Sequence, residues 1–190
     1  VDAANYILFD QGHPMHTFDY NKINNSRIII KKSNKKQTIS CLDGISREVN
    51  DNHLLICDSD KPIAIAGIIG SENSCVDEKT TNILIESAYF DPVTIRKGSK
   101  ELGLLTEASR RFERGADVQA AETALWRVIN LLQEIAGGEI CKDLIDVYPK
   151  IKSNIQINFN IDDCNSLLGT SLDKKEVLSI LKKLSISTKQ

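Results

Sequence analysis

The sequence predicts an α+β fold, in which a meandering mixed or antiparallel β core has helices packed on one side and a truncated small α/β appendage follows. Short runs of β-branched residues alternate with polar turns in the first half of the chain. Apolar residues spaced three and four apart follow, which is typical of helices. A polar segment near residue 150 then separates the remainder, so we expect domains at 1–150 and 153–190.

The first expected elements are a helix and a set of short strands. The helix has Asp2 as its cap and ends near Gly12, ahead of Pro14, so His16 falls in a loop. Strands are expected at 27–31, 37–42, 47–49, 54–57 and 63–66. Asp43-Gly44 predicts a turn between paired strands, because Asp-Gly readily adopts positive φ.

A strand at 82–88 and two helices follow. Asp91-Pro92 predicts a helix start, since the Asp side chain accepts from free N–H groups and Pro suits a first turn; this helix ends near Gly103. A longer helix is expected from about Asp117 to Gly137. Its apolar residues are predicted to face the core: Leu125, Trp126, Ile129, Leu132 and Ile135.

The rest of the chain predicts a domain boundary and an incomplete appendage. The expected elements are a closing strand at 140–147, a linker at 148–154, a strand at 155–160, a short helix capped by Asp162 and ended by Gly169, and a helix at 173–184. The last three bury too little surface to be stable alone. With Val1 in place of an initiator Met, we expect a piece of a longer polypeptide.

Composition limits the classes of protein. The chain has 190 residues, 41% hydrophobic and 26% charged, and no segment approaches the roughly 20 apolar residues of a membrane span. We therefore expect a soluble protein without a membrane partner. The formal net charge is -2, so any nucleic-acid binding must come from local patches.

The cysteines predict neither a metal site nor a disulfide framework. The chain has 5 Cys, with no C-x-x-C pair and no His at ligand spacing. They are Cys41, Cys57, Cys75, Cys141 and Cys164. This pattern fits reduced thiols in a cytoplasmic protein.

Two segments are candidates for chemistry. Glu86 ends a strand that looks buried, so it either belongs to a site or reaches solvent from the strand end. Gly67 and Gly70 follow an apolar strand, where glycine allows close approach of a backbone or ligand or simply forms a turn.

Basic residues are clustered in two places. Arg110, Arg111 and Arg114 can meet phosphates or pair with Glu107 and Glu113, and we favour internal pairing for Arg114. A second basic run is interpreted as solvated surface, with RNA contact as the alternative: Lys31, Lys32, Lys35 and Lys36.

These residues stand in a pattern that resembles the editing domain of bacterial phenylalanine–tRNA ligase β subunits. The matching elements are Asp2-x-x-Asn5-Tyr6, Gly12-x-Pro14-Met15-His16-x-Phe18-Asp19, Leu42-Asp43-Gly44, Ile63-Ala64-Ile65-Ala66-Gly67-Ile68, Glu86-Ser87-Ala88-x-Phe90-x-Pro92, Gly103-Leu104-x-Thr106-x-Ala108-Ser109, Arg111-Phe112-Glu113-Arg114-Gly115-x-Asp117 and Gly137-Gly138. From about residue 153 the chain resembles the start of that subunit's next small domain.

The resemblance implies hydrolysis of tyrosine wrongly attached to the tRNA for phenylalanine. A pocket shaped for phenylalanine cannot strongly exclude an analogue with one added hydroxyl, whereas a second site that hydrogen-bonds the hydroxyl can prefer it. Glu86 matches the position that reads the hydroxyl, since a carboxylate accepts from a phenol.

The resemblance also assigns the other site residues. His16 matches an editing histidine that holds water or the terminal ribose, and Asn5 and Thr106 match site positions. Gly67, Gly70 and Ala108 match the pocket wall, and Ser71 departs from a usual second glycine, which either narrows the pocket or alters the turn. On general grounds, a lone loop histidine is more often structural, and an Asn on a helix bonds locally.

The resemblance places other functions elsewhere in a larger enzyme. It implies no cofactor in this piece, with ATP and magnesium used by the whole enzyme. The implied partners are the tRNA, an α subunit and a second copy of each subunit in a heterotetramer. Two alternatives are a catalytically silent module that joins subunits or supports tRNA, and a nucleic-acid-binding module in the tail after residue 153, which the near-neutral charge disfavours.

Overall fold

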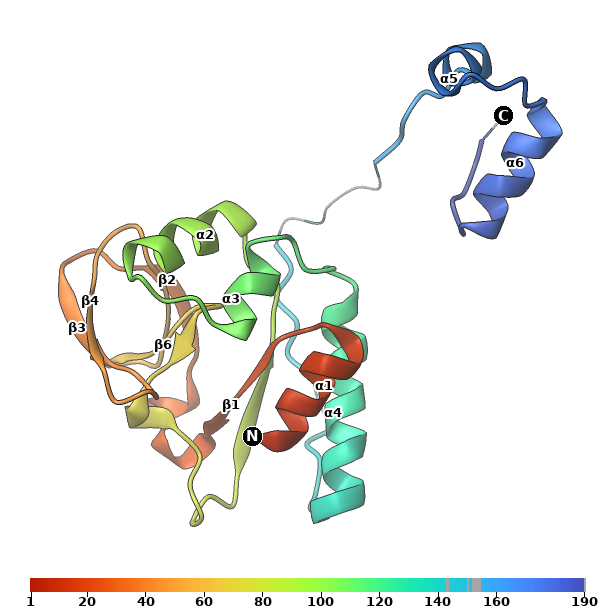
Figure 1. The fold of residues 1–190 in the computed structure, drawn as a ribbon. Helices are drawn as coiled ribbons and strands as arrows, with labels where there is room; N and C mark the ends of the chain where they lie inside the picture. Colours follow the sequence, from red (N-terminus) through yellow and green to blue (C-terminus); the bar gives the residue numbers. More distant parts are fainter. Residues whose placement is uncertain (143, 150, 152–154, 190) are drawn as a thin grey trace. The chain divides into compact units, whose positions relative to one another are not determined.

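A computed structural model describes residues 1–142, 144–149, 151 and 155–189 of the chain (Figure 1). The chain divides into two compact units, Val1–Lys142 and Asp143–Gln190. Part of the linker predicted at 148–154 lies outside the described residues.

The first unit combines four helices and eight strands among its described residues. In chain order they are α1 (Asp2–Gln11), β1 (Met15–Asp19), β2 (Ile29–Lys32), β3 (Gln37–Ser40), β4 (Ser46–Val49), β5 (Leu54–Cys57), β6 (Pro62–Ile65), β7 (Ile69–Gly70), β8 (Ile83–Ser87), α2 (Pro92–Glu101), α3 (Glu107–Phe112) and α4 (Ala120–Ala136). This arrangement is the predicted α+β fold.

The strands pair antiparallel in three sheets. A four-stranded sheet has the order β2-β5-β6-β7, and its β5, β6 and β7 form a meander. The β3–β4 hairpin turns at Gly44, which has φ +76°, as predicted, and a bridge between Cys41 and Ser71 joins it to β7. β1 and β8 come from distant parts of the sequence and pair with each other.

The β1–β8 pair lies between two hydrophobic cores. Phe18 and Leu84 face the larger core, which includes the strands of the four-stranded sheet and residues of α2 and α3. Met15 and Ile85 pack against the smaller core, which is formed by α1 and α4. Successive side chains of a strand point to opposite faces, so this central pair supplies one face to each core.

The start of the chain differs from the prediction in two details. Helix α1 forms, but Asp2 is its first residue, and the cap position is Val1. Gly12 ends α1 in the left-handed conformation, as expected. His16 lies in β1 rather than in a loop, because its segment pairs with β8, a partner far away in the sequence.

Two helices also differ from the prediction. Helix α4 buries Ala124, Leu125 and Val128, whereas Trp126 is 43% exposed and Ile135 is 64% exposed. The prediction is confirmed for Leu125, which is buried in the smaller core, and for Ile129 and Leu132, which pack against it, and is wrong for Trp126 and Ile135. Helix α3, a short helix in the segment read as polar loop, was not predicted.

The second unit contains α5 (Ile161–Leu168) and α6 (Lys174–Lys183). Helix α6 agrees with the helix predicted at 173–184, with Asp173 as its cap, but Asn160 rather than Asp162 caps α5. The strands predicted at 140–147 and 155–160 are wrong for their described residues, which have no pairing partner in the described chain. Within the described residues, no helix has the length and apolar content needed to cross a membrane.

Candidate functional site

The pairing of β1 with β8 places His16 directly opposite Glu86. Opposed residues of an antiparallel pair project from the same face, with Cβ atoms about 4.5–5.5 Å apart. Phe18 and Leu84, the next opposed residues on that face, contribute to the larger core. The two predicted site residues of widely separated segments are thus neighbours.

Glu86 is half-buried, and its carboxyl has no hydrogen-bond or ion-pair partner within the described residues. Burial raises the pKa of Glu86 to about 7, and no neighbouring cation opposes this effect. A desolvated carboxyl without a partner is costly to the fold, which makes it a candidate for binding or catalysis.

His16 is similarly unsatisfied. Its ring lies edge-on to Phe18, with centroids 4.5 Å apart and planes at 79°, and its Nε2 is buried without a hydrogen-bond partner in the described chain. Burial, and secondarily the positive amino group of Val1, lower the pKa of His16 to about 4. The imidazole is therefore neutral at pH 7 and can hold a water molecule or accept a proton.

Gly70 provides the space that the His16 ring occupies. A Cβ at Gly70 would lie 2.6 Å from Cε1 and Nε2 of His16 and 2.8 Å from Cδ1 of Leu42. The N–H of Leu42 donates to the carbonyl of Gly70 at 3.0 Å, which fixes the strand beside the ring. The absence of a side chain at Gly70 is thus required for the geometry of His16.

A glycine is required at position 67 for a different structural reason. Its φ is +67°, and a Cβ there would lie 2.8 Å from Ile95 and from Phe90, both in the larger core. Gly67 is therefore needed for the close approach of α2, rather than for space beside the histidine.

Thr106 and Ala108 belong to α3 and its cap. The Thr106 hydroxyl donates to the carbonyl of Ile68 at 2.9 Å and accepts from the N–H of Ser109 at 3.0 Å. These bonds anchor α3 to the Gly67–Gly70 turn, and Ala108 packs half-buried against the larger core. Together they position the turn that carries the glycine beside the histidine.

Ser71 has a buried role. Its hydroxyl donates to the carbonyl of Ser40 at 2.9 Å, and its N–H donates to the carbonyl of Ile63 at 3.0 Å. Ser71 is only 1% exposed. The side chain that departs from the family's glycine thus docks the β3 strand onto β7.

Asn5 lies exposed on α1, and within the described residues no hydrogen bond joins its side chain to Glu86 or His16. Its backbone N–H donates to the carbonyl of Val1 at 3.0 Å. Ala3 of the same turn is buried in the smaller core, against which Met15, the residue before His16, also packs.

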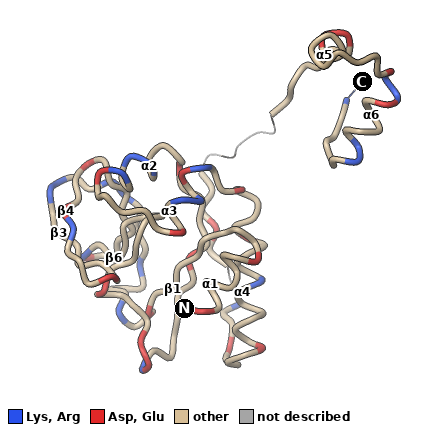
Figure 2. Tube along the Cα trace, viewed as in Figure 1, with Lys and Arg blue, Asp and Glu red and all other residues tan. Residues whose placement is uncertain are grey.

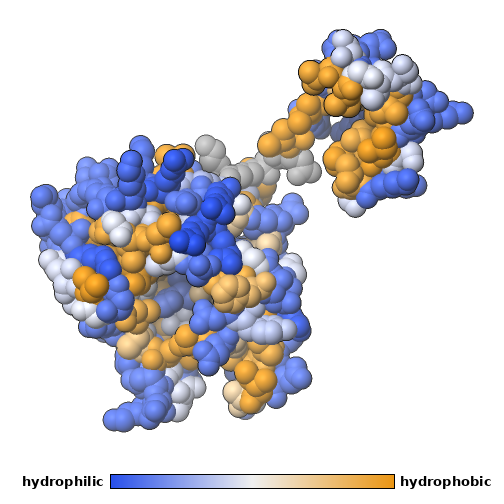
Figure 3. Space-filling view, viewed as in Figure 1, coloured by the Kyte–Doolittle hydropathy of each residue, from blue (hydrophilic) through white to orange (hydrophobic). Residues whose placement is uncertain are grey.

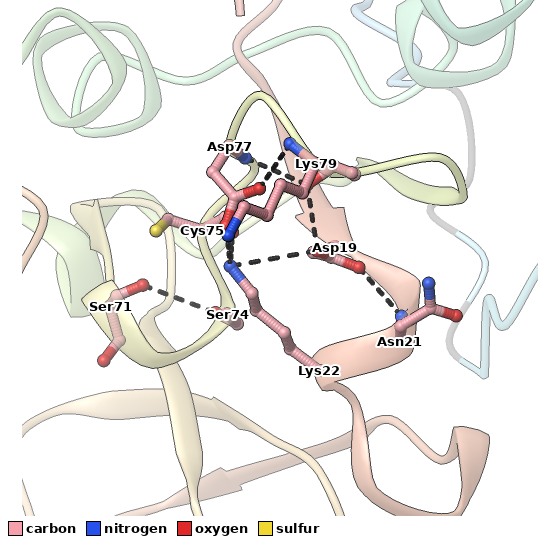
Figure 4. A network of polar contacts seen from close by, with 9 residues as sticks. Asp19, Asn21, Lys22, Ser71, Ser74, Cys75, Asp77 and Lys79 are labelled. Carbon is pink, nitrogen blue, oxygen red and sulfur yellow. Dashed lines mark hydrogen bonds and ion pairs between the residues drawn. The ribbon is translucent and has the colours of Figure 1, made fainter.

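A polar network closes the other end of the β1–β8 pair (Figure 4). Nζ of Lys22 lies 2.8 Å from Asp77, 2.8 Å from the carbonyl of Cys75 and 3.8 Å from Asp19. Thr80 donates to Asp19 at 2.9 Å. The hydrogen bond between Lys22 and Asp77 raises the pKa of Lys22 and lowers that of Asp77. No sequence pattern predicted this network, because Lys22 and Asp77 are far apart in the chain.

The arginines of the α3 segment pair differently from the prediction. Arg111 lies 2.6 Å and Arg110 3.9 Å from Glu107, as helical spacing of three and four residues allows. Arg114 is exposed and has no ion-pair partner in the described chain, so internal pairing of Arg114 was a wrong prediction. It lies beyond the end of α3, outside the reach of Glu107.

The remaining charges give local surface patches (Figure 2). Lys and Arg recur on α2 and α3. In the other basic run, Lys36 pairs with Glu48 at 3.3 Å on the exposed β3–β4 hairpin, which agrees with a solvated surface. No group of three or more His, Cys, Asp or Glu side chains within the described residues is placed to hold a metal ion.

Residues 1–137, which contain both His16 and Glu86, match the B3/4 domain family. The chain belongs to this family.

The predicted resemblance to phenylalanine–tRNA ligase β subunits is confirmed by similar proteins with that name. The chain is 45% identical over 184 residues to the one from Protochlamydia amoebophila, covering 97% of the chain and 23% of that protein. It is 45% identical over 188 residues to that of Geobacter sulfurreducens, covering 99% and 24%. For Fusobacterium nucleatum the identity is 39% over 189 residues, covering 100% and 24%. The chain thus spans about a quarter of the length of these relatives.

Proposed function

We propose that this chain is the editing domain of a phenylalanine–tRNA ligase β subunit, and that it hydrolyses tyrosine from the tRNA for phenylalanine. The observation that supports this most is the unpartnered Glu86 carboxyl directly opposite the unpartnered, neutral His16. The similarity to the named β subunits gives the substrate class.

Glu86 reads the para-hydroxyl of tyrosine in this proposal. In its ionised form the carboxylate accepts a hydrogen bond from the phenol, which replaces the hydration that burial removed. Phenylalanine offers no such donor and leaves the carboxylate unpaired. Because the pKa of Glu86 is about 7, the ionised form becomes dominant only above neutral pH, and selectivity for tyrosine should rise across that range.

His16 holds the attacking water near the ester carbonyl. Its pKa of about 4 keeps the imidazole neutral, and its buried Nε2 is available for a hydrogen bond. Asn5, which the family resemblance assigns to the site, meets the terminal adenosine. Water attack is preferred to a covalent route, since no Ser or Cys within the described residues is paired with a histidine base.

The wall of the site is formed by the Gly67–Gly70 turn, which Thr106 anchors through Ile68. Gly70 supports the histidine ring, and Gly67, Thr106 and Ala108 hold that wall in place from the core side.

The whole enzyme would carry the other steps. Amino-acid activation with ATP and magnesium, the α subunit, the heterotetramer and a cytoplasmic location are proposed for the larger assembly. This chain would supply the hydrolysis of the wrong ester and support accurate charging.

The test is deacylation of tyrosyl-tRNA by the intact enzyme with Glu86→Ala and His16→Ala. We expect Glu86→Ala to lower kcat/KM by about 10- to 100-fold, since a hydrogen bond to a charged group is worth about 1.5–3 kcal/mol. His16→Ala removes the group that holds the attacking water and should lower kcat/KM by about 100-fold. Glu78→Ala, at an exposed glutamate in the loop before β8, is the matched control and should keep the parental rate. Parental rates for both site variants would contradict the proposal and favour a silent scaffold.

A further inference from the structure

Two aromatic side chains lie exposed on one face of α1. Tyr6 is 52% exposed and Phe9 is 71% exposed, and their spacing of three residues places them on the same side of the helix. The opposite face is fully used, because Ala3 and Ile7 pack into the smaller core against α4. Tyr6 and Phe9 therefore form an apolar surface on the solvent side of α1.

Arg111 covers part of this aromatic surface. Its guanidinium carbon lies 5.5 Å from the centroid of the Phe9 ring. The same guanidinium is held by Glu107, at 2.6 Å from the carboxylate and 2.9 Å from the backbone carbonyl. A fixed cation thus lies over the ring, while the high exposure of Phe9 leaves room for a second planar group.

Further positive charge lies next to this pair. Arg114 follows the last turn of α3, with its N–H donating to the carbonyl of Arg111 at 3.2 Å, and its exposed side chain has no ion-pair partner among the described residues. The carboxylate of Asp10, the residue after Phe9, forms an ion pair with Arg127, with Oδ2 3.7 Å from Nε. Figure 3 shows strongly hydrophilic side chains gathered over α2 and α3, with apolar surface directly beside them.

We propose that Phe9 and Tyr6, with Arg111 and Arg114, form a stacking surface for single-stranded RNA. Unpaired bases stack on aromatic rings and guanidinium planes, and their phosphates attract the free cation. The inference rests on the proposed function and names the part of its substrate that this surface binds, which is the unpaired end of the tRNA that carries the ester.

The surface shares helix α3 with the candidate site. Arg111 of α3 lies over the Phe9 ring, and Thr106 at the start of the same helix donates to the carbonyl of Ile68, in the turn whose Gly70 lies beside the His16 ring. An RNA end that stacks on Phe9 is therefore bound against an element that also supports the site.

The test is direct binding of a fluorescent, short single-stranded RNA ending in CCA, and of a blunt RNA duplex, to the 190-residue chain. Phe9→Leu should weaken single-strand binding by about tenfold without affecting the duplex, because it keeps the apolar volume and removes the stacking face. Arg114→Gln should weaken binding by about threefold at about 0.1 M salt and reduce the salt dependence.

Tyr20→Leu and Lys79→Gln are the matched controls. Both residues are exposed at the other end of the β1–β8 pair, and both variants should bind like the parent. In the intact enzyme, Phe9→Leu should raise KM for tyrosyl-tRNA deacylation and leave kcat unchanged.

Unchanged single-strand affinity of Phe9→Leu would overturn the inference. A lower melting temperature of the intact enzyme with unchanged RNA affinity would also overturn it, since it would show that another polypeptide segment covers the ring. The binding assay contains no ester, so failure of the editing proposal, seen as parental deacylation by Glu86→Ala, is measured separately.

Discussion

The polar side chains at the two ends of the β1–β8 pair differ in whether they have hydrogen-bond or ion-pair partners. At one end, Asp19, Lys22 and Asp77 satisfy one another through short hydrogen bonds and ion pairs. At the other end, His16 and Glu86 face each other without a hydrogen-bond partner in the described chain. Polar groups with partners hold a register, whereas polar groups without partners reduce stability and are retained for a ligand.

The largest expected effect is at the satisfied end. Asp19→Ala should lower the free energy of unfolding by about 4 kcal/mol, because it removes the acceptor of Thr80 and a buried carboxylate near Lys22. Urea unfolding at neutral pH measures the change. Asp77→Ala, in an exposed part of the same network, is the control and should cost much less, because solvent screens an exposed ion pair. Equal effects would contradict the role of the buried acid.

The unsatisfied end should respond with the opposite sign. The folded-state pKa of Glu86 is raised, so its contribution to stability is fully present below about pH 4.5 and is lost as pH rises through about 7. Glu86→Gln should therefore stabilise the chain by up to about 3 kcal/mol at about pH 8 and by almost nothing at about pH 4.5. Thermal unfolding across this range tests it, and destabilisation at high pH would show that Glu86 has a stabilising partner.

The contributions of His16 and Glu86 to the pH dependence of stability should cancel in the parent protein. The folded-state pKa of His16 is lowered to about 4, so its contribution is present above about 6.5 and is lost as pH falls through 4. Between these values the two effects oppose, and the parent should change little. His16→Asn should become less stable as pH rises through this window, whereas Glu86→Gln should become more stable. Equal slopes in both variants would rule out this opposition.

The smallest expected effect concerns the docking of the β3 strand. Ser71→Gly removes the hydrogen bond to Ser40 and adds backbone freedom, so it should cost about 1–2 kcal/mol in urea unfolding. Ser71→Ala separates the two causes, since it loses only the hydrogen bond. We expect little change in deacylation from either variant, because the hydroxyl is buried and bonds the carbonyl of Ser40.

Local signals in the sequence predicted local structure well. Asp91-Pro92 and Asp173 gave the starts of α2 and α6, since a cap needs only nearby residues. Helix α3 was not predicted, although Thr106 and Ser109 form a capping box at its start. The strands predicted at 140–147 and 155–160 are wrong, because a strand needs a partner and their described residues have none in the described chain.

Contacts between distant segments were beyond sequence reasoning. His16 and Glu86 were each chosen as candidates from family pattern, but their opposition depends on the register of β1 with β8. On α4, Leu125, Ile129 and Leu132 face the smaller core as predicted, whereas Trp126 and Ile135 are exposed and Ala124 and Val128 complete the buried face. Packing between elements decided both cases.

The most direct test of the account compares tyrosyl-tRNA with phenylalanyl-tRNA as deacylation substrates of the intact enzyme. If Glu86 reads the tyrosine hydroxyl, Glu86→Ala reduces the ratio of the kcat/KM value for tyrosyl-tRNA to that for phenylalanyl-tRNA by about tenfold or more, while Glu78→Ala leaves it unchanged. If Glu86→Ala slows both substrates equally and preserves the ratio, Glu86 does not read the hydroxyl, and the central claim is wrong.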